Sequence, residues 1–182
     1  MKKIIIAAIF SVGSVVANAQ TAASSTATQQ VNLSLTNAIA ITFTGSGTAT
    51  GAAVTLPFTT VSSYTNGVTS SVQSLKVQSN KNFSITVNTN SSTFSYTGST
   101  TPAPSMPVSA LNVKVTANGT GGTIAGTFGS AYTDLSATAQ NLITNGTYGG
   151  NQTFSVQYQA TPGFAYPAGT YTTSVVYTAT QL

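Results

Sequence analysis

Residues 75–87 read LKVQSNKNFSITV, and this stretch decides the class of fold. Apolar residues occupy every second position on either side of the polar triplet at 80–82. A period of two places alternate side chains on opposite faces of a strand, so that one face meets the core and the other meets solvent. An Asn-rich triplet between two such runs is typical of a turn. The stretch therefore predicts two half-buried strands joined by a turn.

The same alternation recurs along most of the chain. Further predicted strands lie at 31–35, 39–43, 54–58, 94–96, 111–115, 124–128, 154–158 and 171–177. Stretches rich in Gly, Pro or Asn separate several of them, at 45–51, 101–107 and 118–122. Short strands broken by turn residues favour an antiparallel sandwich or barrel, and we predict an all-β, Ig-like or fimbrial-type β-sandwich.

Residues 133–143 favour a helical turn instead. Asp134 supplies an acid where the first turn would begin, and Ala137 and Ala139 have high helix propensity. The apolar pair Leu142-Ile143 ends the segment. Because no long segment shows a clear period of 3.6 residues, we expect at most one short helix, near 133–143.

The N-terminus carries the pattern of an export signal. Lys2 and Lys3 precede the apolar run Ile4–Phe10, and small residues follow at Ala17 and Ala19. A positive start, a short apolar run and a small-residue cleavage site are typical of a secretory signal peptide. The run is too short to span a bilayer, and no second apolar run of spanning length follows it. We expect residues 1–19 to be removed, leaving an exported chain without a transmembrane segment, periplasmic, extracellular or at the cell surface.

The mature chain fits a single domain. A chain of 182 residues suits one domain or two small ones. Residues 20–29 read QTAASSTATQ, which is small and polar without periodicity and indicates a flexible N-terminus. Residues 30–182 are then expected to form one β-sandwich domain. Since the sequence has no Cys, packing and main-chain hydrogen bonds must stabilise that domain without disulfides.

Charged residues are almost absent from the sequence. They make up 3% of the chain, against about 25% in a typical soluble domain. After removal of residues 1–19, the charged side chains are Lys76, Lys81, Lys114 and Asp134. Three scattered lysines form no basic patch, which excludes nucleic acid as a partner.

The same composition excludes most kinds of catalysis. There is no His, no Glu and no Cys, and Asp134 is the single acid. General acid–base catalysis, hydrolysis by paired carboxylates and metal binding all need groups that this chain lacks. We therefore expect no enzymatic activity, no catalytic residue, no metal site and no cofactor. A self-formed crosslink between a lysine and an asparagine, assisted by Asp134, is the one covalent chemistry left open.

The C-terminal residues resemble those of bacterial surface β-sandwich domains. The turn at 167–171 reads PAGTY and leads into a final alternating strand, and Phe154–Tyr158 fits the strand before it. Fimbrial subunits and spore-coat-protein-U-type domains are similar here, as is the WxL wall-binding type. The sequence has no Trp, so the wall-binding motif of the WxL type is missing.

The likeness to chaperone–usher pilins extends to single positions. Those subunits often have a glycine fourteenth from the end, where this chain has Gly169. They have apolar residues at the eighth, sixth and fourth places, where this chain has Val175, Tyr177 and Ala179. The chain departs from the pattern at Gln181, where those pilins have an aromatic residue, and it lacks their pair of Cys.

This resemblance implies assembly by β-strand addition. Fimbrial domains lack one strand and accept the N-terminal segment of the next subunit, whose main chain gives affinity and whose alternate side chains fill pockets. The residues predicted to form assembly strands are Val31, Leu33, Leu35, Tyr171, Val175, Tyr177 and Ala179. The simpler interpretation of 31–35 is that it forms the first strand of its own domain.

The leading interpretation is an exported, non-catalytic structural or adhesive subunit that assembles with itself or with other envelope or fimbrial proteins. Low charge and high β-propensity favour strand-to-strand association. The alternative is a carbohydrate- or cell-wall-binding module, for which Tyr132, Tyr148 and Tyr166 in turn or loop contexts are the better surface candidates. A third interpretation is an inert secreted protein without a specific ligand.

We expect the exported protein to begin at Gln20, because signal peptidase cleaves after the small-residue pattern at Ala17 and Ala19. Tandem mass spectrometry of the N-terminal peptide measures this. The variant Ala19→Asp places a charge at the cleavage position and should retain residues 1–19. An exported wild-type chain that keeps Met1 would contradict the assignment.

Overall fold

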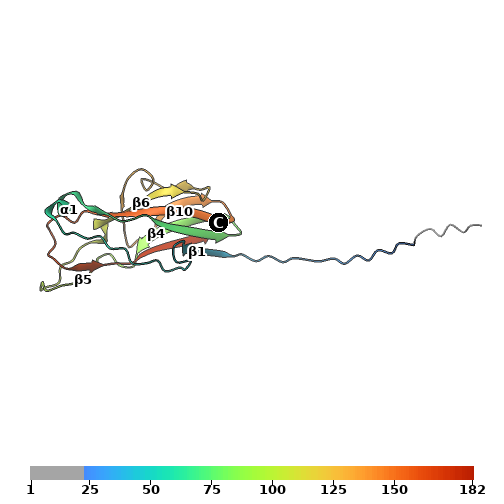
Figure 1. Ribbon diagram of the computed structural model, residues 1–182, viewed down its shortest axis with the longest axis horizontal. Coiled ribbons are helices and arrows are strands. Elements are labelled where there is room, and N and C mark those ends of the chain that lie inside the picture. Colours follow the sequence, from blue (N-terminus) through green and yellow to red (C-terminus); the bar gives the residue numbers. More distant parts are fainter. Residues whose placement is uncertain (1–22) are drawn as a thin grey trace, which may run out of the picture. The chain divides into compact units, whose positions relative to one another are not determined.

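The computed structural model describes residues 23–182 (Figure 1). Residues 23–34 and residues 35–182 belong to separate units, and only the second contains helices and strands. The expected signal peptide, residues 1–19, lies outside the described residues. Within the described part, no helix has both the length and the apolar character needed to cross a bilayer.

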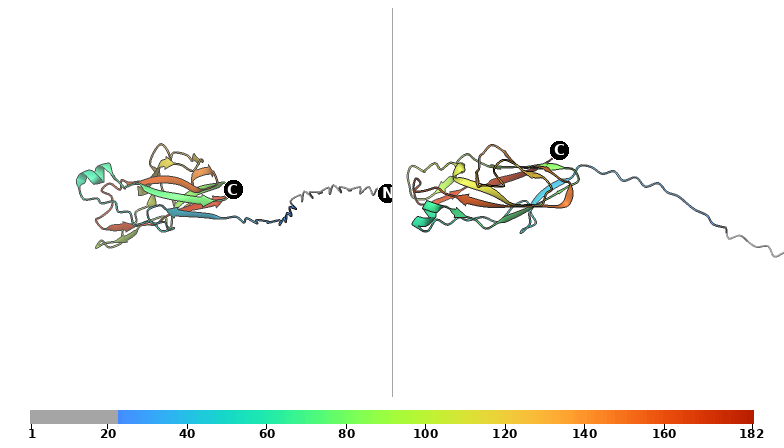
Figure 2. Two further views of the ribbon diagram at one scale, coloured as in Figure 1. Left: turned by 45° about the vertical axis from the view of Figure 1, so that its right-hand side comes forward. Right: turned by 90° about the horizontal axis from the view of Figure 1, so that it is seen from above.

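Residues 35–182 form an antiparallel β-sandwich, which confirms the predicted fold class (Figures 1 and 2). The first sheet has the order β1-β3-β10-β6-β8, and β2 also pairs with β10. Its strands are β1 (Ile39–Phe43), β2 (Val68–Thr69), β3 (Gln73–Ser79), β6 (Leu111–Asn118), β8 (Thr133–Asp134) and β10 (Gly149–Ala160). The second sheet has the order β12-β4-β9-β7. Its strands are β4 (Phe83–Thr89), β7 (Thr123–Ile124), β9 (Gln140–Gly146) and β12 (Val175–Gln181).

Smaller elements gather near one end of the sandwich. β5 (Ser95–Thr97) and β11 (Thr170–Thr172) pair with each other in a short ribbon. The helix α1 (Val61–Asn66) precedes β2, and the 3₁₀ turn η1 (Val108–Ala110) leads directly into β6. In Figure 1, α1 and β5 lie at the end of the sandwich opposite the C-terminus.

The core lies between the two sheets and is built from alternate residues of their strands. Leu75 and Val77 of β3 enter it from the first sheet, and Phe83, Ile85 and Val87 of β4 enter it from the second. The turn at 80–82 therefore carries the chain from one sheet to the other. The remaining fully enclosed apolar side chains come mostly from the central strands β6, β9 and β10.

The expected helix at 133–143 is wrong. These residues form β8, a crossing segment and the start of β9. Leu135, Leu142 and Ile143 are all buried, and their spacing of seven and eight residues also suits one face of a helix. Their main chain bonds to other strands instead, as the amide of Leu135 donates to the carbonyl of Leu111 at 3.0 Å. Pairing with neighbouring strands therefore overrides the local helix propensity of the alanines.

The helix that does form, α1, begins with a reciprocal cap. The hydroxyl of Thr60 accepts a hydrogen bond from the amide of Ser63 at 3.2 Å, and the hydroxyl of Ser63 accepts one from the amide of Thr60 at 3.1 Å. A capping box usually has Glu or Gln where this chain has Ser63. The helix ends at Gly67, whose φ of 79° lies in the region that favours glycine.

Two predicted strands are absent, and of the strand predicted at 124–128 only Ile124 lies in one, β7, because residues 126–130 form a turn. Residues 31–35 are in no strand, so the interpretation of this segment as the first strand of its own domain is wrong, and β1 is the first strand. Residues 54–58 also lack a ladder, although Leu56 packs against the core and Phe58 is half-buried. In both segments the alternation of side chains is present but the main chain has no strand partner among the described residues.

We expect Phe154→Ala to lower the free energy of unfolding by about 3–5 kcal/mol, because its ring is 1% exposed and its loss leaves a cavity between the sheets. Urea unfolding of the mature chain measures the change. The matched variant Val176→Ala, on the outward face of β12 and 41% exposed, should change it by less than about 0.5 kcal/mol. Equal effects of the two variants would contradict the described core.

Candidate functional site

Two edge strands meet on one side of the sandwich. Among residues 23–182, β1 pairs only with β3, and β12 pairs only with β4. The two strands lie close together, since the ring of Phe43 on β1 meets the ring of Tyr177 on β12 edge to face, with centroids 6.4 Å apart. Each strand thus has one side of its main chain outside any ladder. We call the strip between β1 and β12 the edge seam.

The edge seam is only half covered by protein. Val175, Tyr177 and Ala179 alternate along β12 toward the core, but each remains half-buried. Ile41 and Phe43 on β1 are half-buried as well, whereas the inward residues of the adjoining strands β3 and β4 are almost fully enclosed. A cavity of about 160 Å³ opens between the strands, lined by Ile41, Thr42, Phe43, Ala49, Leu75, Val175, Val176 and Tyr177. The interior of the sandwich is therefore only partly covered along this strip.

A polar cluster holds one end of the edge seam together. The side-chain nitrogen of Gln181 lies 2.9 Å from the carbonyl oxygen of Ala38, 3.0 Å from the hydroxyl of Ser79 and 3.0 Å from the amide oxygen of Asn80. Asn80 in turn donates to the carbonyl of Thr36 at 2.7 Å. Gln181, at the position where pilins have an aromatic residue, thus links the end of β12 to the start of β1.

A pair of phenols joins the two sheets beside the edge seam. The hydroxyls of Tyr158 on β10 and Tyr177 on β12 lie 2.8 Å apart. Burial raises the pKa of Tyr158, and burial together with the neighbouring Tyr158 raises the pKa of Tyr177 well above its ordinary value. Both side chains therefore stay neutral at a pH where an exposed tyrosine would ionise.

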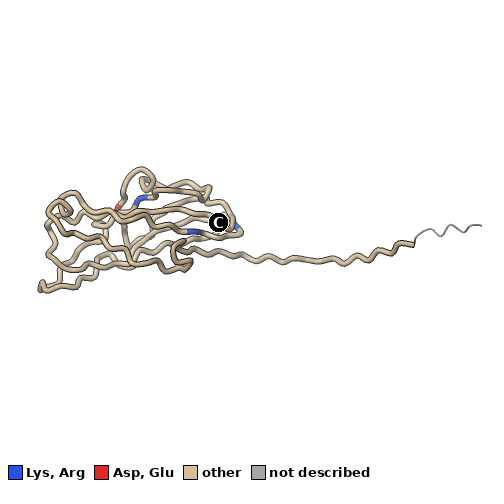
Figure 3. The backbone as a smooth tube through the Cα atoms, in the orientation of Figure 1, with Lys and Arg blue, Asp and Glu red and all other residues tan. Residues whose placement is uncertain are grey.

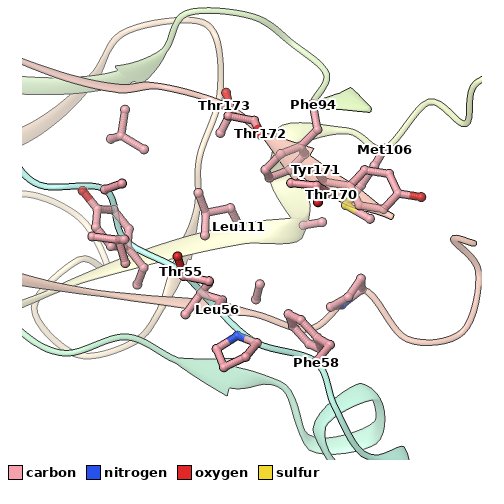
Figure 4. A pocket seen from close by; sticks show the side chains of 18 of the residues that line it. Thr55, Leu56, Phe58, Phe94, Met106, Leu111, Thr170, Tyr171, Thr172 and Thr173 are labelled. Atoms are coloured by element: carbon pink, nitrogen blue, oxygen red, sulfur yellow. The ribbon is translucent and has the colours of Figure 1, made fainter. Parts of the chain in front are cut away.

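A larger cavity of about 840 Å³ lies at the α1 end of the sandwich and shares Phe43 and Val175 with the edge seam. In Figure 4, Leu56 and Phe58 approach it from one side, and Phe94, Met106 and Tyr171 approach it from the other. Its wall also includes Tyr64 of α1, Leu111 of β6, Tyr158 of β10 and Tyr166. We call this space the end cavity.

Aromatic rings in the lining of the end cavity pack against two further rings, those of Tyr96 and Phe164, that lie outside the lining. Tyr64 packs against Phe58 with ring centroids 5.4 Å apart, and it stacks on Phe164 at 5.2 Å with an interplanar angle of 21°. Tyr171 contacts Tyr96 at 5.1 Å and Tyr166 at 6.3 Å. Phe164 is 67% exposed, so this chain of contacts runs from the cavity wall to the surface.

The turn at residues 167–169, which reads PAG, forms part of one wall of the end cavity. The hydroxyl of Tyr96 donates to the carbonyl of Ala168 at 3.0 Å, and the hydroxyl of Tyr171 donates to the carbonyl of Pro167 at 2.9 Å. A Cβ at Gly169 would lie 2.3 Å from the ring of Tyr96. Glycine is therefore required here because the Tyr96 ring occupies the space of a side chain.

The structure brings some of the predicted assembly residues together. Val175, Tyr177 and Ala179 share the inward face of β12, whereas Tyr171 lies on the separate strand β11 in the wall of the end cavity. The hydrogen bond from the amide of Ser174 to the side-chain oxygen of Asn90, at 2.9 Å, marks the break between β11 and β12. The predicted donor residues Val31, Leu33 and Leu35 are 75%, 86% and 88% exposed.

The charged residues lie on outward positions. Lys76 and Lys114 are half-buried on strands whose inward residues alternate with them, and Lys81 is exposed. Asp134 is exposed and accepts a hydrogen bond from Asn112. Figure 3 shows how few charged positions interrupt the otherwise uncharged chain. A crosslink of the kind left open by the sequence would need a lysine, an asparagine and the acid in one buried cluster, which these positions do not form.

The tyrosines proposed as surface candidates differ in their surroundings. Tyr148 is 62% exposed. Tyr132 is half-buried, and its hydroxyl donates to Gln157 at 2.8 Å. Tyr166 belongs to the end cavity. Tyr64 and Phe164 carry no signal in the sequence, because only the fold brings α1 beside the turn that follows β10.

We expect the protein to lose stability as the pH rises above about 10. The unfolded chain then releases protons from Tyr158 and Tyr177, while the folded chain, in which burial raises both pKa values, retains them. Urea unfolding between pH 8 and 11 measures this. The double variant Tyr158→Phe with Tyr177→Phe should flatten the decline. A decline as steep in the double variant as in the wild type would contradict the assignment.

The comparisons with known proteins identify no family. No family model matches the chain, and no match is found among curated proteins. The likeness of the C-terminal residues to fimbrial and spore-coat-type domains therefore rests on those residues alone.

Proposed function

We propose that this protein is an exported, non-catalytic structural or adhesive subunit of the cell surface or extracellular space, which assembles with copies of itself by β-strand addition. Residues 30–36 of one copy, here called the donor segment, would pair with the free side of β12 in another copy. The observation that carries this proposal is the half-covered edge seam, where two edge strands leave apolar side chains and main-chain groups available.

The donor segment fits the acceptor in length and pattern. Residues 30–36 read QVNLSLT, and β12 also spans 7 residues. Val31, Leu33 and Leu35 would occupy the alternate positions that face the seam, while the main chain adds a ladder to β12. The three side chains are largely exposed, so their burial on assembly would contribute a hydrophobic driving force of about 25 cal/mol per Å² of apolar surface removed from water.

Nothing in β12 protects its edge. Natural sheets avoid association at their edges with charged side chains, prolines or bulges. Residues 175–181 read VVYTATQ, without a charge or a proline, and their pairing with β4 runs without a register shift. The chain as a whole has so little charge that two copies would repel each other only weakly. These features favour association between copies over a solitary domain.

Assembly with other envelope or fimbrial proteins would use the same chemistry. A partner chain with an exposed segment of alternating apolar residues could pair with β12 as the donor segment does. We favour a second copy as the partner, because the chain itself supplies a segment of the required length and pattern. The proposal needs no cofactor, metal or catalytic residue.

We expect the mature protein, residues 20–182, to form oligomers or filaments in size-exclusion chromatography with light scattering and in negative-stain electron microscopy. Leu33→Asp should abolish assembly, because it would place a charge in the apolar seam of the neighbouring copy. The matched variant Thr26→Asp adds the same charge to the N-terminal segment outside the donor residues and should assemble normally.

A peptide test separates the donor from the acceptor. A synthetic peptide of residues 28–38 should bind the full-length Leu33→Asp variant and raise its midpoint of thermal unfolding, whereas the same peptide carrying Asp at position 33 should not. A wild-type protein that stays monomeric, or a Leu33→Asp variant that assembles like the wild type, would contradict strand addition by this segment.

A further inference from the structure

The end cavity has the size of a ligand site. Its volume of about 840 Å³ falls within the range of roughly 300–1,000 Å³ that is typical of small-molecule pockets. The space stays open although the central core beside it is closely packed, with Val113 and Val156 at 0% exposure. Elements far apart in sequence hold its walls, among them α1, β6, β10 and β11.

The aromatic rings of the cavity offer flat faces for stacking. Phe58 and Tyr64 lie on the wall, and Phe164 continues the stack to the surface with two-thirds of its area exposed. An exposed ring held parallel to another ring presents a face rather than an edge to an incoming molecule. Such faces bind the C–H surfaces of sugar rings, just as they bind other apolar surfaces.

Hydroxyl groups accompany these rings. The hydroxyl of Tyr171 donates a hydrogen bond to the carbonyl of Pro167, but the hydroxyls of Tyr64 and Tyr166 make no hydrogen bond to residues 23–182. Thr55 and Thr172 add further hydroxyls to the lining. A wholly apolar occupant, such as an acyl chain, would leave these polar groups without partners when it displaced water. An occupant with hydroxyls of its own would satisfy them.

The lining carries no charge. The charged side chains of the described residues are Lys76, Lys81, Lys114 and Asp134, and none of them belongs to the end cavity. A phosphate, a carboxylate or an amine would therefore lose its hydration without gaining an ionic partner. The site selects for neutral molecules.

We propose that the end cavity binds a short, neutral oligosaccharide, with Tyr64 of its lining and Phe164, which stacks on Tyr64, as the platform for a sugar ring and the hydroxyls of Tyr64 and Tyr166 as hydrogen-bonding groups. This function is additional to assembly. The platform lies on α1 and on the loop after β10, whereas the edge seam lies on β1 and β12. A subunit with both features would display a glycan-binding site on each copy of an assembly.

Isothermal titration calorimetry on the mature protein tests the proposal. The probes are cellotetraose, maltotetraose, mannotetraose and tetra-N-acetylchitotetraose, with tetragalacturonate as the anionic control and N-phenyl-1-naphthylamine as a neutral apolar probe. We expect at least one neutral tetrasaccharide to bind with a Kd below about 1 mM and tetragalacturonate not to bind. Titrating the Leu33→Asp variant in parallel separates this result from assembly, because loss of assembly should leave sugar binding unchanged.

Matched variants locate the binding to the end cavity. Phe164→Ala should weaken binding about tenfold through loss of the stacking face, and Tyr64→Phe should weaken it about fivefold through loss of one hydroxyl while keeping the ring. Tyr148→Ala removes a ring of similar exposure outside the cavity and should have no effect. Three results would each overturn the proposal. The apolar probe could bind while no sugar does, or no tetrasaccharide could bind at about 10 mM. The third is that Phe164→Ala and Tyr148→Ala have equal effects on binding.

Discussion

Each strand of this protein can bury only one of its two faces, and that constraint arranges the rest of the molecule. Apolar residues at every second position make each sheet apolar on one side, so the two sheets must face each other to remove that surface from water. Leu75 and Val77 of β3 and Phe83 and Ile85 of β4 meet in this way across a three-residue turn. The arrangement buries the inward side chains in the middle of each sheet completely. At the sides of the sandwich, the inward side chains of the edge strands are buried only as far as neighbouring segments cover them.

The edge seam is where this arrangement is incomplete. β1 and β12 close one side only through contacts such as that of Phe43 with Tyr177, and the inward residues of both strands stay half-buried. In most proteins charged residues at such edges prevent association, but here 3% of the chain is charged and β12 contains no charge. A composition so poor in charged residues therefore leaves no charged side chain on β12 to oppose the approach of another strand. The polar cluster around Gln181 and Asn80 keeps the two strands in place without closing the seam.

Much of the sandwich could be predicted from sequence because period-two alternation reports directly which face of a strand is buried. Residues 75–79, 83–87, 111–115 and 154–158 are strands with the expected inward residues. The prediction of a helix at 133–143 was wrong because Leu135, just after β8, and Leu142 and Ile143, in β9, are spaced as they would be on one face of a helix. Only main-chain partners that are distant in sequence decide between the two structures. Residues 31–35 alternate like a strand without being one, since alternation describes side chains and says nothing of whether a ladder partner exists in the same chain. Of the predicted assembly residues, Val175, Tyr177 and Ala179 lie together on β12. Tyr64 of the end cavity and Phe164, which stacks on it, become neighbours only in the fold.

The central claim is that residues 30–36 of one copy lie against β12 of another, and disulfide trapping tests it most directly because the chain has no Cys of its own. Variants with one cysteine at Val31, Leu33 or Leu35 would each be mixed with Ala179→Cys and oxidised mildly, with exposed Ala137→Cys replacing Ala179→Cys as the control. We expect mixed disulfide dimers between at least one donor position and Ala179→Cys, and none with Ala137→Cys. No trapping at Ala179→Cys from any of the three positions, or equal trapping at Ala137→Cys, would contradict it.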